Sequence, residues 1–278
     1  MTDVEVSLLT AGSCRHPAGV ARRGAGRRPV DFPALVAVIR HPQHGVVLFD
    51  TGYTPRFFAE TSRFPASVYA RATPVRCAPH DTAAAQLRRQ GVDPEDVTHV
   101  VVSHFHADHV GGARDFPRAR FLHRRGALER LRRAPALARL RHGFLPGLLP
   151  ADLAARATHV EDLPRTAPLG GLGPGFDLLG DGSLVGVPLP GHQEGHLGLH
   201  VPEVDLLLVG DAVWSSRAVS HLELPHPVVR LITHDWRAYR ETVTALHDLQ
   251  RDRPGLLVVP SHCAEAITRA RAALGTHR

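Results

Sequence analysis

The sequence concentrates metal-binding side chains in one short segment, HFHADH at residues 104–109. Three imidazoles and one carboxylate fall within six residues, and both donor types bind zinc and similar divalent metals. If the preceding strand continues through this segment, His104 and His106 point to one face, because strand side chains repeat every two residues. Asp108 and His109 then fall on the following turn. One compact loop is therefore predicted to supply ligands to two neighbouring metals.

Histidine is frequent in this chain, with 20 His among 278 residues, so a chance cluster is the simplest alternative explanation. At that frequency an HxHxDH pattern arises by chance in on the order of one sequence of this length in a few hundred. The segment also follows an apolar, β-branched run at 97–103, which predicts a buried strand. A ligand cluster at a strand end therefore explains the segment better than composition does.

Three further segments each place a ligand-type side chain just beyond a predicted strand. These are His192 in PGHQEGH after residues 184–188, Asp211 in VGDA after 206–209, and His262 in PSH after 256–259. Four strand ends that each carry such a side chain are difficult to explain by core packing. His196 is expected to support the site or to pack on a strand rather than to bind a metal.

Strands and helices alternate along the chain, which favours a layered α/β sandwich with the site at the strand ends. Strands are predicted at 4–10, 34–40, 46–49, 97–103, 119–123, 184–188, 196–201, 206–210 and 256–259. Helices are predicted at 81–90 (capped by Asp81 and ended by Gly91), 124–141, 236–251 and 264–274. Residues 15–29 are expected to form an exposed loop, and 55–79 a loop or short helices near a site entrance. No linker divides the chain, so residues 1–278 are expected to form a single domain.

The whole set of motifs resembles the metallo-β-lactamase superfamily, in the order of that family, over residues 4–274. The resemblance rests on Asp50 in FDTG together with the 104–109 segment, His192, Asp211 and His262. It implies a four-layer αββα sandwich with a dinuclear metal site between two sheets. It further implies that His104, His106 and His192 bind one metal and that Asp108, His109 and His262 bind the second. Asp211 is then expected to bridge both metals, and Asp50 to orient the ligands without binding a metal itself.

This resemblance implies a hydrolase. Two zinc ions, or iron, manganese or cobalt on the same donors, lower the pKa of a bridging water and supply hydroxide near neutral pH. Asp108 is expected to pass a proton to the leaving oxygen. The predicted activity is hydrolysis of a small-molecule ester or lactone. The alternatives are a thioesterase similar to glyoxalase II and a mononuclear iron enzyme similar to the persulfide dioxygenases.

The runs FPALVAVIRHPQHGVVLFDTGY and GHQEGHLGLH are similar to the N-acyl homoserine lactone lactonases. Those enzymes usually carry tyrosine three residues after the bridging aspartate, where this chain has Trp214, an indole without a hydroxyl. Candidate substrate contacts are therefore Trp214, His221, His234 and Tyr239. The aromatic residues within 55–69 could line an apolar acyl pocket or pack against the sandwich.

Composition sets the remaining expectations. The chain has a formal net charge of +6 and no lysine, so its 33 basic residues are all arginine. Because these are spread along the chain, compositional bias is favoured over nucleic-acid binding, and a small molecule is the expected partner. Three cysteines without CxxC spacing, no signal-peptide pattern and no run of about 20 apolar residues predict a cytoplasmic protein without membrane association. A homodimer is left open.

Overall fold

The computed structural model describes residues 3–275 and contains two β-sheets packed face to face. The first sheet comprises β1 (Glu5–Pro17), β2 (Pro29–His41), β3 (Gly45–Phe49), β4 (Val75–Arg76), β5 (Val97–Val101), β6 (Arg120–His123) and β7 (Ala157–His159), in the order β4-β1-β2-β3-β5-β6-β7. The second comprises β8 (Arg165–Pro168), β9 (Pro174–Asp177), β10 (Val185–Pro188), β11 (Leu197–Val201), β12 (Leu206–Gly210) and β13 (Leu257–Pro260), in the order β13-β12-β11-β10-β9-β8.

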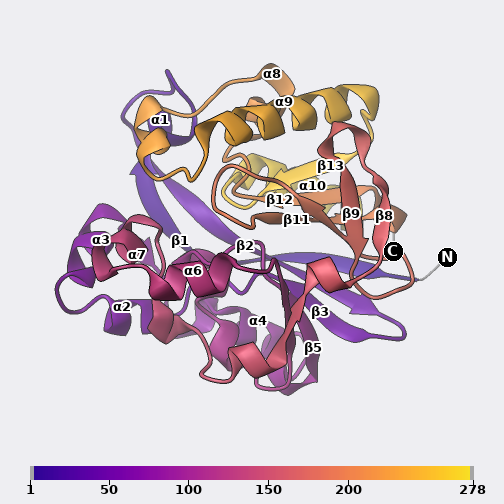
Figure 1. Ribbon diagram of the computed structural model, residues 1–278, viewed down its shortest axis with the longest axis horizontal. Helices are drawn as coiled ribbons and strands as arrows, with labels where there is room; N and C mark the ends of the chain where they lie inside the picture. The colour runs from indigo at the N-terminus through magenta and orange to yellow at the C-terminus, as the bar shows by residue number, and fades with distance from the viewer. Residues whose placement is uncertain (1–2, 276–278) are drawn as a thin grey trace.

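Helices cover both outer faces, which confirms the predicted αββα sandwich (Figure 1). The first sheet is covered by α4 (Ala83–Arg89), α5 (Ala107–Val110) and α6 (Ala127–Arg133), and the second by α8 (Ser216–His221) and α9 (Trp236–Asp252). The closing helix α10 (Ala264–Gly275) contacts β1, β2 and β13. Four short helices, α1 (Ala18–Ala21), α2 (Arg56–Glu60), α3 (Ala66–Ala72) and α7 (Ala136–Arg141), lie at the left of Figure 1.

Central strands are apolar on both faces because both faces are covered. In β2, Leu35 and Ile39 pack in the cluster between the sheets, whereas Val36 and Val38 pack under the helices of the first outer face. Strand β12 alternates in the same way between the inter-sheet cluster and the cluster under α9. Burial on both faces explains why these strands are nearly continuous apolar runs.

Several boundaries differ from the sequence predictions. Strand β1 continues to Pro17 and pairs with β2 from Pro29, and α1 lies between them, so the expected exposed loop at 15–29 is confirmed only for residues 22–28. The end of this strand was not predicted because the segment 15–29 is rich in Gly, Pro and Arg. The expected helix at 124–141 is two helices, because Pro135 lacks the N–H that an uninterrupted helix needs.

The start of α4 and four short elements were also predicted differently. Thr82, not Asp81, caps α4, since the Thr82 hydroxyl accepts from the Ala85 N–H, while Gly91 follows the helix at φ +75° as expected. The sequence prediction missed β7, β8, β9 and α8, which are three to six residues long. Segments of this length carry too little periodicity to be recognised.

Candidate metal centre

The candidate ligands lie at the ends of strands that run in the same direction. Strands β3 and β5 are parallel neighbours in the first sheet, and β12 and β13 are parallel neighbours in the second. Strand β10 runs with β12, because both are antiparallel to β11. The loops after these strands therefore converge on one edge of the sandwich, as loops at the carboxyl ends of parallel strands do.

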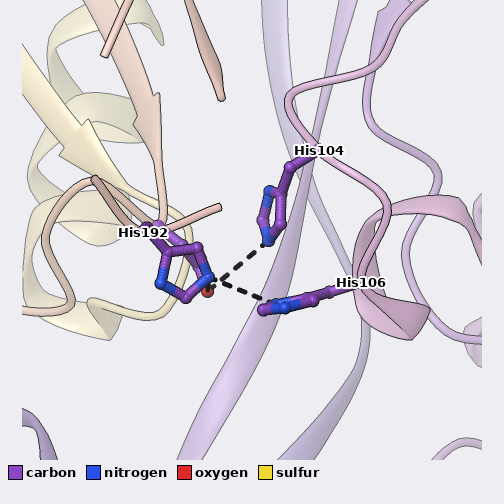
Figure 2. A group of neighbouring side chains, drawn as sticks. His104, His106 and His192 are labelled. Carbon is purple, nitrogen blue, oxygen red and sulfur yellow. Dashed lines mark hydrogen bonds and ion pairs between the residues drawn. The ribbon is translucent and has the colours of Figure 1, made fainter. Parts of the chain in front are cut away.

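One group of ligand-type atoms comes from His104, His106, His192 and Asp211. Figure 2 shows the three imidazole rings pointing toward one another, two from the loop after β5 and one from the loop after β10. His192 Nε2 lies 3.2 Å from His106 Nδ1 and 3.4 Å from Asp211 Oδ2. His104 Nε2 lies 4.0 Å from the same carboxylate oxygen. Four donors thus converge on one point.

A second group comes from Asp108, His109 and His262, beside the first. His262 Nε2 lies 3.2 Å from Asp108 Oδ2 and 3.2 Å from Asp211 Oδ1. His109 Nε2 lies 3.5 Å and 3.3 Å from the same two oxygens. Asp211 therefore directs Oδ2 at the first group and Oδ1 at the second, the arrangement of a carboxylate that bridges two ions.

Hydrogen bonds on the outer nitrogens fix the tautomers of two rings. His109 Nδ1 lies 2.7 Å from Asp50 Oδ2, and His262 Nδ1 lies 2.8 Å from the Pro33 carbonyl oxygen. A carboxylate and a carbonyl only accept, so each Nδ1 carries a proton, and the lone pair needed for a metal is on Nε2. Such a partner on the far nitrogen is usual for metal-binding histidines.

Ser103 extends this arrangement from Asp50 to His104. The Ser103 N–H and Oγ–H each donate to the Asp50 carboxylate at 2.8 Å, so Oγ accepts from His104 Nδ1 at 2.9 Å. The Nε2 atoms of His104 and His109 are then buried and have no hydrogen-bond partner among the described residues. Unpaired buried nitrogens facing a carboxylate are costly unless a cation lies between them. The donor set therefore fits divalent metal ions.

The backbone around Asp50 is shaped for this network. Asp50 follows β3 with φ 59°, a left-handed conformation that aspartate adopts more readily than most residues. Gly52 follows with φ 69°, and a Cβ there would lie 2.3 Å from the Ala11 side chain. The Thr51 hydroxyl donates to the His109 carbonyl oxygen at 2.9 Å. The FDTG motif thus holds the 104–109 loop through both backbone and side-chain contacts.

Burial and charge divide the two groups electrostatically. Burial lowers the pKa of His106 to about 4 and holds the pKa of His104 and His192 well below the ordinary value, so these rings are neutral and free to bind metal. Burial also opposes protonation of His262, but Asp211 and Asp108 raise its pKa to about 10. The second group therefore attracts positive charge, whether a proton or a metal ion.

Three supporting residues lie in or beside the motifs but were not assigned these contacts from the sequence. Ser103 precedes the first motif and binds Asp50 as described. The Gln193 side chain accepts from the Phe105 N–H at 2.8 Å, and His196 Nε2 accepts from the Asp211 N–H at 3.1 Å. His196 is thus a supporting residue, as expected. Their position within the motif segments was the available signal.

A cavity of about 630 Å³ opens above the two groups. His106, Asp108, His192 and Asp211 contribute to its floor. Trp214, a candidate substrate contact, lines it, with its ring 5.8 Å from that of His192. Of the aromatic residues in 55–69, Phe64 and Tyr69 line the cavity, whereas Phe57 is buried in packing. This segment therefore contributes some aromatic residues to the cavity lining and others to packing.

The other three candidate substrate contacts lie outside this cavity. His221 is exposed at the end of α8. His234 donates its backbone N–H to the His192 carbonyl oxygen at 2.9 Å, but its side chain lines a separate groove along α9. Tyr239 is buried and stacks on Trp236, with ring centroids 5.2 Å apart. These positions follow from α9 packing on the outer face of the second sheet, away from the ligand loops.

A further cluster of His41, His44 and Asp181 lies outside the candidate metal centre. His41 Nδ1 accepts from the backbone N–H groups of Gln43 and His44 at 3.2 and 3.1 Å. The ring proton is therefore on Nε2, which faces Asp181 Oδ2 at 3.0 Å. This nitrogen lies at ion-pair distance from the carboxylate and has no lone pair for a metal, so the cluster joins two turns.

Comparison with known proteins places this arrangement among metallo-hydrolases. A family model for the metallo-beta-lactamase superfamily matches residues 29–262. The chain is 29% identical over 242 residues to a probable metallo-hydrolase of Mycobacterium tuberculosis, covering 82% of this chain and 74% of the relative. It is 27% identical over 276 residues to an N-acyl homoserine lactonase of Azorhizobium caulinodans, covering 96% and 95% of the two chains.

Solved structures share the same fold. A structure of an N-acyl homoserine lactone hydrolase, with the product N-hexanoyl-L-homoserine at its catalytic metal centre, matches with a TM-score of 0.73 at 16% identity, covering 97% of each chain. A dizinc quorum-quenching lactonase matches with a TM-score of 0.67 at 15% identity, covering 95% of this chain and 89% of the other.

Proposed function

The chain belongs to the metallo-β-lactamase superfamily, and from that premise we propose that it is a dinuclear metal-dependent hydrolase of small-molecule esters or lactones. The observation that carries the proposal is the position of Asp211. Its two carboxylate oxygens face two different ligand groups, at 3.4 Å from His192 Nε2 and 3.2 Å from His262 Nε2. A single-metal site would not need an intact second group.

The residues of the floor have distinct roles in this proposal. Two zinc ions held by the two groups would supply a hydroxide nucleophile near neutral pH and polarise the substrate carbonyl. Asp108 lines the cavity, and its carboxylate is placed to pass a proton to the leaving oxygen. Asp50 and Ser103 keep His109 and His104 in the tautomers that bind metal.

The cavity walls favour a substrate with an apolar substituent. The wall residues include Val68, Leu140 and Ile232, which suit an acyl chain, and several curated relatives are named N-acyl homoserine lactonases. Tyr69 adds a polar group. Its hydroxyl and the His106 ring both lie beside Gly143, since a Cβ built on Gly143 would lie 3.3 Å from the hydroxyl and 3.0 Å from the ring. We assign this hydroxyl to orienting the substrate. A hydroxyl can both donate and accept a hydrogen bond, whereas the Trp214 indole can only donate.

Two other activities remain in competition, and the second ligand group bears on both. A thioesterase would use the same nucleophile and differ only in the leaving group. A mononuclear iron oxidoreductase would use the first group alone and would leave Asp108, His109 and His262 without a metal. The tautomer of His262, fixed by the Pro33 carbonyl oxygen, favours a second ion over that arrangement.

The test is metal content followed by activity on the same sample. Protein purified without chelators is expected to carry two metals per chain and to hydrolyse acyl homoserine lactones faster than aryl esters or thioesters. Chelation is expected to abolish turnover, and zinc is expected to restore it. Well under one metal per chain would refute the proposal. One iron per chain with oxygen uptake on a persulfide substrate would assign the oxidoreductase instead.

A further inference from the structure

Large apolar side chains are exposed around the mouth of the cavity. Among residues 3–275, eight large hydrophobic side chains are strongly exposed, and six of these line this cavity, namely Phe64, Val68, Leu137, Val228, Leu231 and Ile232. Phe64 is 80% exposed, Leu137 70% and Leu231 62%. Apolar side chains gathered in this way mark an interaction surface rather than scattered surface residues.

These side chains belong to three segments, 63–73, 133–143 and 226–232, which together we call the cavity rim. The segments meet around the opening: α3 contacts α7, the two helices lie side by side in Figure 1, and Arg141 Nε donates to the Leu231 carbonyl oxygen at 2.8 Å. All three segments line the same cavity. The rim is therefore one surface assembled from parts far apart in the sequence.

The cavity rim also carries the charge excess of the whole chain. Its segments contain six arginines, Arg63, Arg71, Arg133, Arg139, Arg141 and Arg230, and no aspartate or glutamate. The other 27 arginines equal in number the 27 acidic residues of the chain. None of the six forms an ion pair with a carboxylate within the part of the chain that the structure describes, whereas many arginines elsewhere do.

We propose that the cavity rim docks on an anionic lipid surface. Exposed apolar side chains can enter the boundary between headgroups and acyl chains, while arginines beside them pair with lipid phosphates. Five of the six arginines are exposed, Arg141 lines the cavity itself, and the rim segments contain no carboxylate that would face the negative headgroups. Apolar insertion and positive charge on one face are the two signals that together give stable peripheral binding.

A second copy of this chain fits the cavity rim less well. In a two-fold symmetric pair the same surface meets itself, so six arginines would face six arginines. With no acidic residue in the rim segments, nothing on that surface would neutralise them. Like charges brought together in this way oppose association.

The expectation of no membrane association rests on the lack of a run of about 20 apolar residues in the sequence. None of the helices described in residues 3–275 is long and apolar enough to cross a bilayer. Surface docking needs no such helix, since its apolar residues come from three separate segments. If the proposed hydrolase activity is also correct, a docked cavity would open toward the bilayer in which an acylated substrate dissolves.

Vesicle co-sedimentation of the metal-loaded protein tests the docking without reference to activity. The protein is expected to bind vesicles of phosphatidylcholine with phosphatidylglycerol at least about tenfold better than phosphatidylcholine alone, and added salt is expected to weaken this binding. Replacing apolar rim residues in the double variant Leu137→Ser/Leu231→Ser is expected to reduce binding as well. Equal binding to both vesicle types, or to neither, overturns the proposal.

Charge reversal locates the surface. The double variant Arg71→Glu/Arg133→Glu is expected to weaken vesicle binding by more than about twentyfold, since each arginine near an anionic surface contributes roughly fivefold. The matched control Arg88→Glu/Arg269→Glu makes the same charge change on α4 and α10, at exposed arginines outside the rim, and is expected to retain most of the binding. Equal losses in both variants would show a delocalised charge effect and overturn the assignment to the rim. If the protein is a dimer in solution and Leu137→Ser/Leu231→Ser makes it monomeric, the rim is a dimer interface and the lipid proposal is overturned.

Discussion

The cavity has a floor of buried ligand-type side chains and a rim of exposed apolar and basic side chains, and the two regions differ in what holds them. Beside the floor, the ligand-type residues His109 and His262 are fixed by hydrogen bonds to Asp50 and to the Pro33 carbonyl oxygen. On the rim, Phe64 and Leu137 are mostly exposed. The floor is thus organised before any ligand arrives, whereas the rim has apolar surface left to bury. We infer that the floor determines the reaction and that the rim determines which surface the protein binds.

The largest effect is expected from the residue that serves both ligand groups. Asp211→Asn removes the charge shared by the two groups, so metal content is expected to fall below two per chain and hydrolysis by more than about 100-fold. Elemental analysis and lactone hydrolysis on one sample measure both. Asp152→Asn, the same change at an exposed carboxylate that pairs with Arg156, is the control and is expected to keep full activity. Full activity in Asp211→Asn would show that the floor residues are not needed for hydrolysis.

Asp50→Asn tests whether the floor depends on the contacts behind the ligands. Asparagine tolerates the left-handed backbone at this position, so the change isolates the carboxylate that accepts from His109 and Ser103. Metal affinity is expected to drop about 10–100-fold, and excess metal is expected to restore much of the activity. Competition with a chromogenic chelator measures the affinity. An unchanged affinity would mean that tautomer control is unimportant here.

Ile232→Ser tests the apolar rim against the floor. Loss of apolar contact is expected to raise KM about tenfold for a long-chain acyl lactone, with a much smaller change for a short-chain one. The metal content and kcat are expected to stay near those of the parent protein, because the floor is untouched. Leu222→Ser, at an exposed leucine outside this cavity, is the control. Equal changes for both chain lengths would argue that the acyl chain does not contact the rim.

The smallest effect is expected at Trp214, where the floor meets the wall. Its buried Nε1 has no partner among the described residues. If that N–H donates to the substrate, Trp214→Phe raises KM by a few fold. Removing an unpaired buried donor is also expected to stabilise the free protein by about 1 kcal/mol, read as a higher unfolding midpoint. Stabilisation without a KM change would assign Trp214 to packing alone.

Most strands and helices could be predicted from local sequence patterns. The apolar runs of β2, β5 and β12 were recognised because burial on both faces leaves continuous hydrophobic sequence. The outer half of β1 was missed because its sequence, AGSCRHP, contains Gly and Pro and lacks an apolar alternation. Pro135 divides α6 from α7, although the apolar spacing continues across it. The predicted boundaries of these elements were therefore wrong where strand pairing or a single proline mattered more than the periodicity of apolar residues.

The sequence by itself determined which side chains can bind metal and that each follows a strand, because ligand chemistry and strand periodicity are local properties. Only the tertiary structure decided that the two oxygens of Asp211 face different ligand groups, since this depends on how the loops of two sheets meet. It likewise placed Trp214 in the cavity and moved Tyr239 to the outer face of the second sheet. The cavity rim could not be seen in the sequence, because its three segments are separated by more than 50 residues and become neighbours only through packing.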